Sequence, residues 1–258
     1  MDIVLQGAIY NNTLETAQYY LQLDFVDRVI ISTWIDQSIS FNNDDKIVIV
    51  KSNKPEISSG NMNYQIVSSR EGLKYANPKD NIVAKMRSDQ RIFHDSMKLM
   101  YTFFLDRSTS SKISIDNELG PTAPIYVLGI GSKFPFHPQD HVFVGRTEDV
   151  VELFNIPLMS GEIATKTNNT NFNIDLRQPI YLGAQHCSKF KPIIKHYLSN
   201  FREYLTDNAE KREEAMALSA QIRDIIFKAF PKIKMFWTKY NSDYWYSSYE
   251  AQGEYYGK

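Results

Sequence analysis

The 258-residue chain has a formal net charge of −1, which argues against a general nucleic-acid-binding protein because such proteins usually carry a basic excess. Hydrophobic residues at 43% and charged residues at 23% are typical of a soluble globular protein, and the length predicts one large domain or one domain with a helical appendage. The single cysteine, Cys187, excludes an internal disulfide framework and a multi-cysteine zinc site.

The first 90 residues alternate between short apolar runs and amphipathic segments. The apolar runs, which predict strands, lie at residues 2–5, 29–34, 46–50 and 82–89. Helices are expected over residues 13–25 and 61–76, where apolar side chains recur at helical spacing. This order favours a mostly parallel sheet covered by helices on both faces, and hence the α/β class.

The rest of the chain predicts further elements of both kinds. Further strands are expected at residues 125–129, 141–145 and 179–182. Further helices are expected at residues 95–105, 148–154 (capped by Thr147), 192–205 and 209–230. The aromatic tail at 236–258 either packs over the domain or contacts sugars or a membrane surface.

Polar residues follow three of the expected strands. They are Gln6 and Gly7, then Ser32, Thr33 and Trp34, and then Arg87, Ser88 and Asp89. The carboxyl ends of parallel strands meet at one edge of a sheet, where ligands bind in open α/β folds. We therefore expect these groups to converge on one cleft.

The segment at residues 81–92 carries three cations and one carboxylate, namely Lys85, Arg87, Arg91 and Asp89. Charges at the end of a buried strand are costly unless they pair or bind something charged. One interpretation is therefore a site for an anionic ligand, such as a nucleotide diphosphate with or without a metal. The other is a strand end whose charges pair with one another.

Asp89 is the candidate metal ligand, because a carboxylate can hold a hard cation that bridges two phosphates. The alternative is an ion pair of Asp89 with Arg87 or Arg91. Lys85 and Arg87 alternate along the strand and so share a face, where they could bind phosphate or form a structural ion pair.

Asp140 precedes an expected strand and is the candidate general base, since a carboxylate there could accept a proton from an attacking hydroxyl. Glu148 and Asp149 compete for this role, but their place in the first turn of a helix already explains them electrostatically. The sequence has no P-loop, no Gly-x-Gly-x-x-Gly fingerprint and no Gly-x-Ser-x-Gly elbow.

Several short motifs occur in a fixed order over residues 1–155. They are QG (6–7), ISTW (31–34), SNKP (52–55), Asn-x-Asn-x-Gln (61–65), SSREGL (68–73), KMRSDQRI (85–92) and DHVFVG (140–145), with Glu148 and Asp149. In these motifs the chain resembles the WavE-type lipopolysaccharide-synthesis glycosyltransferases and related cell-surface polysaccharide transferases.

The resemblance implies a GT-A-like fold that transfers a sugar from a nucleotide-sugar donor to a glycan or glycolipid acceptor. It divides the chain into a transferase domain at 1–190, with a nucleotide-binding half at 1–92 and an acceptor half at 93–190. A helical and aromatic C-terminal extension, 191–258, would pack on this domain. Independently of the resemblance, the polar composition and the lack of an apolar run long enough to span a bilayer predict a cytoplasmic enzyme that can contact a membrane-borne acceptor, and the net charge predicts no nucleic-acid partner.

The resemblance also places individual residues. Arg87-Ser88-Asp89 would occupy the place of the Asp-x-Asp metal motif, with Asp89 holding Mn²⁺ or Mg²⁺. The first acid is missing here, so Arg87 or Lys85 would share the phosphate charge. Gln6 and Gly7 would lie by the base, and the residues expected near the ribose and diphosphate are Ser32, Thr33, Asn61, Gln65 and Arg70. Asp140 would deprotonate the acceptor in an inverting reaction.

Two rival functions stay open from the sequence. One is a nucleotidyltransferase acting on sugar phosphates, for which Gln6-Gly7-Ala8 would be a poor phosphate loop. The other is a non-catalytic glycan-binding protein built on a transferase fold.

Overall fold

The computed structural model describes most of the first 159 residues and parts of the remainder. The described residues are 1–39, 44–58, 61–78, 82–110, 125–128, 130–131, 138, 140–159, 186, 210, 213–214, 216–217, 219, 227–229, 233–237, 247–251 and 254–255. The expected strand at 179–182 and helix at 192–205 lie outside them.

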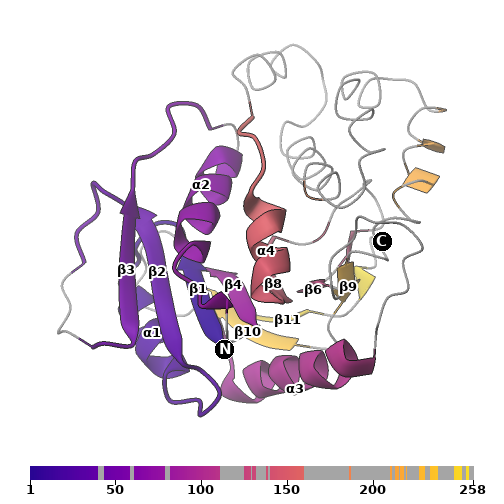
Figure 1. Cartoon of the computed structure of the whole chain (residues 1–258), viewed down its shortest axis with the longest axis horizontal. Coiled ribbons are helices and arrows are strands. Elements are labelled where there is room, and N and C mark those ends of the chain that lie inside the picture. The colour runs from indigo at the N-terminus through magenta and orange to yellow at the C-terminus, as the bar shows by residue number, and fades with distance from the viewer. Residues whose placement is uncertain are drawn as a thin grey trace.

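A central sheet of seven strands runs through the described part of the chain in the order β3-β2-β1-β4-β8-β6-β9 (Figure 1). The strands are β1 (Asp2–Gln6), β2 (Arg28–Trp34), β3 (Ile47–Ser52), β4 (Val83–Arg87), β6 (Ile125–Val127), β8 (Val142–Gly145) and β9 (Phe227–Ala229). Neighbouring strands are parallel except where β8 meets β4 and β6. The predicted α/β class with a mostly parallel sheet is confirmed, and the topology is consistent with a GT-A-like fold.

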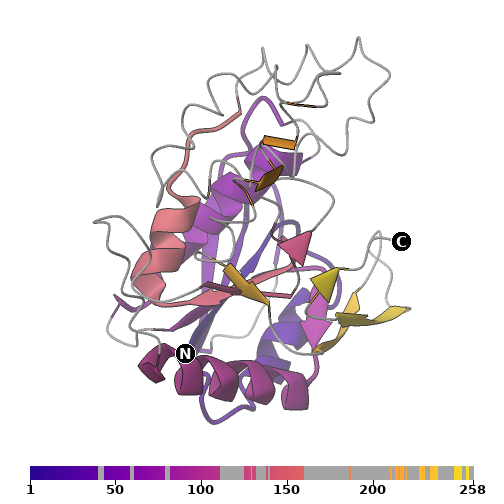
Figure 2. The ribbon, with the colours of Figure 1, turned by 90° about the vertical axis from the view of Figure 1, so that its right-hand side faces the viewer.

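Helices cover both faces of this sheet, because alternate strand residues point to opposite sides. α1 (Thr13–Tyr20) and α3 (His94–Ser110) pack on the face that contains Ile3 and Leu5. α2 (Met62–Leu73) and α4 (Thr147–Phe154) pack on the face that contains Val4. Figure 2 shows α3 along the bottom of the view and α4 above the sheet.

The remaining strands connect distant parts of the chain. β5 (Gln90–Ile92) pairs with β10 (Ile233–Trp237), which pairs with β11 (Ser247–Ala251). In a separate pair, β7 (Ile130–Gly131) is parallel to β12 (Glu254–Tyr255). Among the helices that the structure describes, none is long and apolar enough to cross a bilayer.

Two expectations about helix ends are wrong. The helix predicted over 209–230 cannot reach its expected end, because Phe227–Ala229 forms β9 and pairs with β6. Thr147 is the first residue of α4 rather than its cap, since the extended Arg146 takes the cap position. The Thr147 hydroxyl donates a hydrogen bond to the Asn77 carbonyl at 3.4 Å instead.

The absence of a side chain at Gly72 lets α2 lie close against β1 and β2. A Cβ atom at this position would be 2.7 Å from Ser32 Cβ and 2.8 Å from Val4 Cγ1. Both neighbours are fully buried, so neither has space to move away. Close packing at Gly72 therefore sets the distance between α2 and the carboxyl ends of these strands.

Gly72→Ala should lower the free energy of unfolding by about 1–3 kcal/mol, because the added methyl group overpacks this contact. Urea denaturation measures the loss. Glu71→Ala is the matched control, because Glu71 is the neighbour of Gly72 in the sequence and its own side chain lies at the surface, where it pairs with Lys74. Loss of this pair should lower the free energy of unfolding by less than about 1 kcal/mol. Equal losses in the two variants would contradict the proposed role of Gly72.

Candidate functional site

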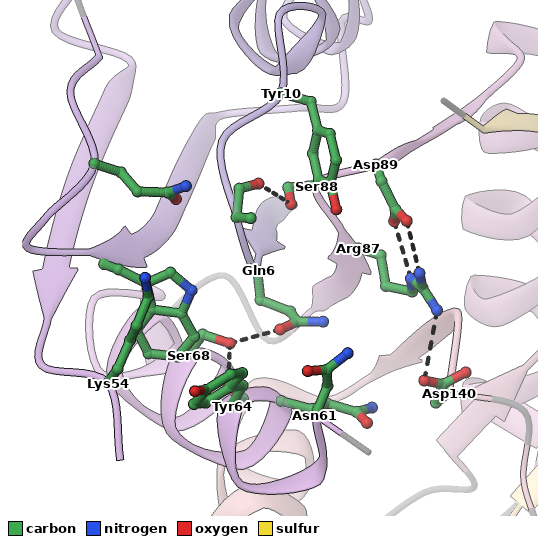
Figure 3. A pocket seen from close by; sticks show the side chains of 15 residues that line it. Gln6, Tyr10, Lys54, Asn61, Tyr64, Ser68, Arg87, Ser88, Asp89 and Asp140 are labelled. Atoms are coloured by element: carbon green, nitrogen blue, oxygen red, sulfur yellow. Dashed lines mark hydrogen bonds and ion pairs between the residues drawn. The ribbon is translucent and has the colours of Figure 1, made fainter. Parts of the chain in front are cut away.

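A cavity of about 390 Å³ opens at the carboxyl ends of β1, β2 and β4 (Figure 3). Its lining comes from the ends of these strands, the segments that follow β1, β2, β3 and β4, the helix α2 with the residue before it, and the segment before β8. The predicted site residues that line it are Gln6, Gly7, Asn61, Gln65, Arg87, Ser88, Asp89 and Asp140. The expected convergence of polar strand ends on one cleft is therefore found for most of the predicted residues.

Four predicted residues do not line the cavity. Ser32 is fully buried beneath Gly72. Thr33 is also buried, and its hydroxyl donates to Gln37 Oε1 at 2.7 Å. Arg70 lies on α2 and pairs with the neighbouring Glu71 at 3.5 Å. Lys85 is the fourth, and it is fully buried.

The turn after β1 forms one wall of the cavity. Gly7 has a φ of +123°, a conformation that favours glycine. A Cβ atom here would also lie 3.0 Å from Ser88 Oγ. Ser88 fastens the turn, since its hydroxyl donates to the Ala8 carbonyl at 2.6 Å and its amide to the Gln6 carbonyl at 3.0 Å.

The side chain of Gln6 presents its amide nitrogen to the cavity. Its Oε1 atom accepts a hydrogen bond of 2.6 Å from the Ser68 hydroxyl on α2. This contact orients the amide group, and Nε2 points into the cavity in Figure 3. The cavity therefore holds a hydrogen-bond donor in a fixed position.

Helix α2 contributes a polar and aromatic wall. Asn61, which precedes the helix, has a φ of +64°, in the left-handed region that asparagine tolerates. Tyr64 packs against Trp34 with 5.4 Å between ring centroids. Gln65 Nε2 is buried and has no hydrogen-bond partner among the described residues. This wall thus combines planar rings with amide groups.

Arg87, Asp89 and Asp140 form a charged cluster in the cavity (Figure 3), while the fourth charged lining residue, Lys54, pairs with Asp36 at 2.6 Å. Arg87 donates two parallel hydrogen bonds to Asp89, from Nε to Oδ1 at 2.9 Å and from Nη2 to Oδ2 at 2.6 Å. Its Nη1 atom is 3.9 Å from Asp140 Oδ2. Arg91 pairs with Glu15 at 2.8 Å instead. Of the two arginines considered as ion-pair partners of Asp89, Arg87 is therefore the one that pairs with it.

Burial and neighbouring charges shift the pKa values of Arg87 and Tyr10. Burial acts to lower the pKa of Arg87, but the hydrogen bonds and charge of Asp89, together with the charge of Asp140, raise it overall. Arg87 is therefore a permanent cation. The pKa of the Tyr10 phenol is raised by burial and by the charge of Asp89. Tyr10 consequently stays neutral beside the ion pair.

Lys85 lies behind Asp140. Its Nζ atom donates to the Asp140 carbonyl at 3.1 Å and lies 5.2 Å from the ring centroids of Phe143 and Phe154. Burial lowers the pKa of Lys85 to about 7, although the charge of Asp140 opposes this effect. Its contacts therefore place Lys85 as a support for Asp140.

The donor set does not fit a divalent cation in this arrangement. Both carboxylate oxygens of Asp89 accept hydrogen bonds from Arg87. The guanidinium also carries a positive charge next to the position that a cation would take. No group of three or more histidine, cysteine, aspartate or glutamate side chains suited to a metal occurs within the described ranges. The competing acids Glu148 and Asp149 lie in the first turn of α4 and do not line the cavity.

The cavity also contains residues that the sequence motifs did not single out for binding. They are Ala8, Tyr10, Gln37, Lys54, Tyr64 and Ser68, whereas Trp34 was expected at this edge after the second strand. A signal for some of them was available on α2, because Asn61, Tyr64, Gln65 and Ser68 are spaced three or four residues apart. Residues at this spacing share one face of a helix.

Comparison with protein families supports the similarity noted in the sequence. A family model described as WavE lipopolysaccharide synthesis matches residues 5–221. The matched range includes every residue that lines the cavity. No curated protein matches the chain.

Lys85 yields a prediction about pH and stability. Its pKa is about 7 in the folded protein and 10.5 by reference, so the unfolded state binds more protons between these values and stability rises with pH. We expect the free energy of unfolding to rise relative to that of Lys85→Met by up to about 1.4 kcal/mol per pH unit. Urea titrations of both proteins across this window measure it. A difference that stays constant with pH would refute the effect of burial on Lys85.

Proposed function

The chain belongs to the WavE lipopolysaccharide synthesis family, and from this premise we propose that it is a glycosyltransferase. It moves a sugar from a nucleotide-sugar donor to a glycan or glycolipid acceptor. The observation that carries the proposal is the cavity at the carboxyl edge of the sheet, with a half-buried guanidinium beside polar amides and aromatic rings. Ligands of open α/β sheets bind at this edge.

The size and charge of the cavity suit the donor. Its volume of about 390 Å³ lies within the range common for small-molecule sites. The planar guanidinium of Arg87 can bind phosphate oxygens through parallel hydrogen bonds. We assign the diphosphate of the donor to this part of the cavity.

In this proposal the nucleoside lies on the side of the cavity that faces α2. Gln6 Nε2 supplies a hydrogen-bond donor there, and Gln65 lines the same part of the cavity. The Trp34 and Tyr64 rings supply flat apolar surface. These groups suit a base and a ribose, whose edges are polar and whose faces are apolar.

Asp140 acts as the general base in this proposal. Its side chain is 41% exposed at the edge of the cavity, where an acceptor can reach it. The acceptor hydroxyl oxygen attacks the anomeric carbon while its proton passes to Asp140. The bond from the anomeric carbon to the phosphate oxygen breaks, and the nucleoside diphosphate leaves with the electron pair. Arg87 stabilises the negative charge that develops on the leaving group.

Several finer expectations stay predictions. They concern the cytoplasmic location, the peripheral membrane contact and the lack of a nucleic-acid partner. The division at residue 190 is also a prediction, while β9, from beyond that position, pairs with β6 in the central sheet.

The direct test is turnover of a panel of nucleotide-sugars, measured as release of the nucleoside diphosphate. We expect one donor to be hydrolysed slowly without acceptor and faster with cell-surface glycans. Binding of a donor with no release under any condition would favour the non-catalytic alternative. Cleavage within the diphosphate would favour a nucleotidyltransferase.

Asp140→Asn should reduce turnover of the preferred donor by about 100- to 10,000-fold, because the variant cannot accept the proton. Affinity for the donor, measured by calorimetry, should change little. Glu148→Gln is the matched control, since it removes an acid of α4 outside the cavity. Equal losses in both variants, or an unaffected Asp140→Asn enzyme, would remove Asp140 from the mechanism.

A further inference from the structure

We propose that Arg87, and not a divalent cation, carries the charge of the donor diphosphate, and that Asp89 is a positioning residue for Arg87. This inference rests on the proposed function, which it deepens by naming how the diphosphate is held. It departs from the sequence-based expectation that Asp89 ligates Mn²⁺ or Mg²⁺.

The contact between Arg87 and Asp89 is a two-point clamp. Two parallel hydrogen bonds of 2.9 and 2.6 Å fix the plane of the guanidinium. Asp89 is only 14% exposed, so solvent competes little for its oxygens. Such bidentate pairs combine strength with geometric specificity. Asp89 therefore fixes both the position and the orientation of Arg87.

The clamp leaves one edge of the guanidinium for a ligand. Arginine has five N–H donors in a fixed plane, and Asp89 accepts two of them, from Nε and Nη2. Nη1 faces Asp140 at 3.9 Å, a distance beyond a hydrogen bond. A phosphate oxygen that enters the cavity can thus bind the Nη1 edge without breaking the clamp.

A metal at the same place would meet two obstacles. It would need an oxygen of Asp89, and both oxygens already accept hydrogen bonds from Arg87. It would also lie beside a guanidinium that does not lose its charge at neutral pH. The family resemblance points the same way, because it places Arg87 where GT-A enzymes have the first acid of the Asp-x-Asp motif.

The wild-type protein provides the first test. Calorimetry measures binding of inorganic pyrophosphate and of UDP, GDP, CDP and ADP, once with a chelator and once with Mn²⁺. We expect the dissociation constants of the preferred ligand to agree within about twofold. Binding that weakens by about tenfold or more in the chelator would overturn the inference and leave the proposed function intact.

The remaining outcomes separate the two claims. Pyrophosphate that binds equally in both buffers while every nucleoside diphosphate fails would support the role of Arg87 and contradict the proposed function. Failure of all ligands in both buffers would overturn both claims.

Variants provide the second test, with the fold of each checked by circular dichroism. Arg87→Lys should weaken diphosphate binding by about tenfold or more, because an ammonium lacks the planar fork. Asp89→Asn should weaken it less, since the amide oxygen still accepts one hydrogen bond from Arg87. Arg91→Met is the matched control, because Arg91 lies four residues away and pairs with Glu15.

The variants also give a clear contrary result. A loss of binding in Asp89→Asn that exceeds the loss in Arg87→Lys would favour Asp89 as a metal ligand and overturn the inference. If the Arg87 variant does not fold, the first test still decides whether a metal is needed, because it compares binding to the wild-type protein with chelator and with Mn²⁺.

Discussion

The parallel pairing of β1 with β2 and β4 is the constraint on which the site depends. In this register Gln6 lies opposite both Ser32 and Arg87. β1 and β4 therefore end at the same level, β2 continues two residues further to Trp34, and the polar ends of all three strands meet at one edge. Apolar residues before these ends fill both cores, with Ile3 and Leu5 on one face and Val4 on the other. The same alternation that buries the sheet thus delivers the functional groups to its edge.

Charged side chains surround Arg87 at this edge of the sheet. Arg87 lies between two carboxylates, and the buried Lys85 supports the main chain at Asp140. A guanidinium held in this way keeps its charge and its orientation before a ligand arrives. Preorganised charge of this kind is what stabilises a departing diphosphate without a cost of reorganisation during the reaction. The geometry of the ion pair therefore connects the fold to the proposed chemistry.

The sequence predicted the strands around the cavity well, because β-branched runs followed by polar residues are local patterns. It did not predict Lys85 correctly as a cavity residue, since its burial depends on β8, where Phe143 pairs opposite it. Nor could it predict Ser32, which α2 covers through the close contact at Gly72. The C-terminal strands were missed for the same reason, because β9 and β10 form only through pairing with β6 and β5, far away in the chain.

A crystal structure of the protein with its preferred nucleoside diphosphate, grown in the presence of Mn²⁺, tests the central claim most directly. The account predicts phosphate oxygens within hydrogen-bond distance of Arg87 Nη1, the clamp to Asp89 intact, and the base between Gln6 and Tyr64. A diphosphate bound outside the cavity, or a Mn²⁺ ion on Asp89 with Arg87 turned away, would contradict it.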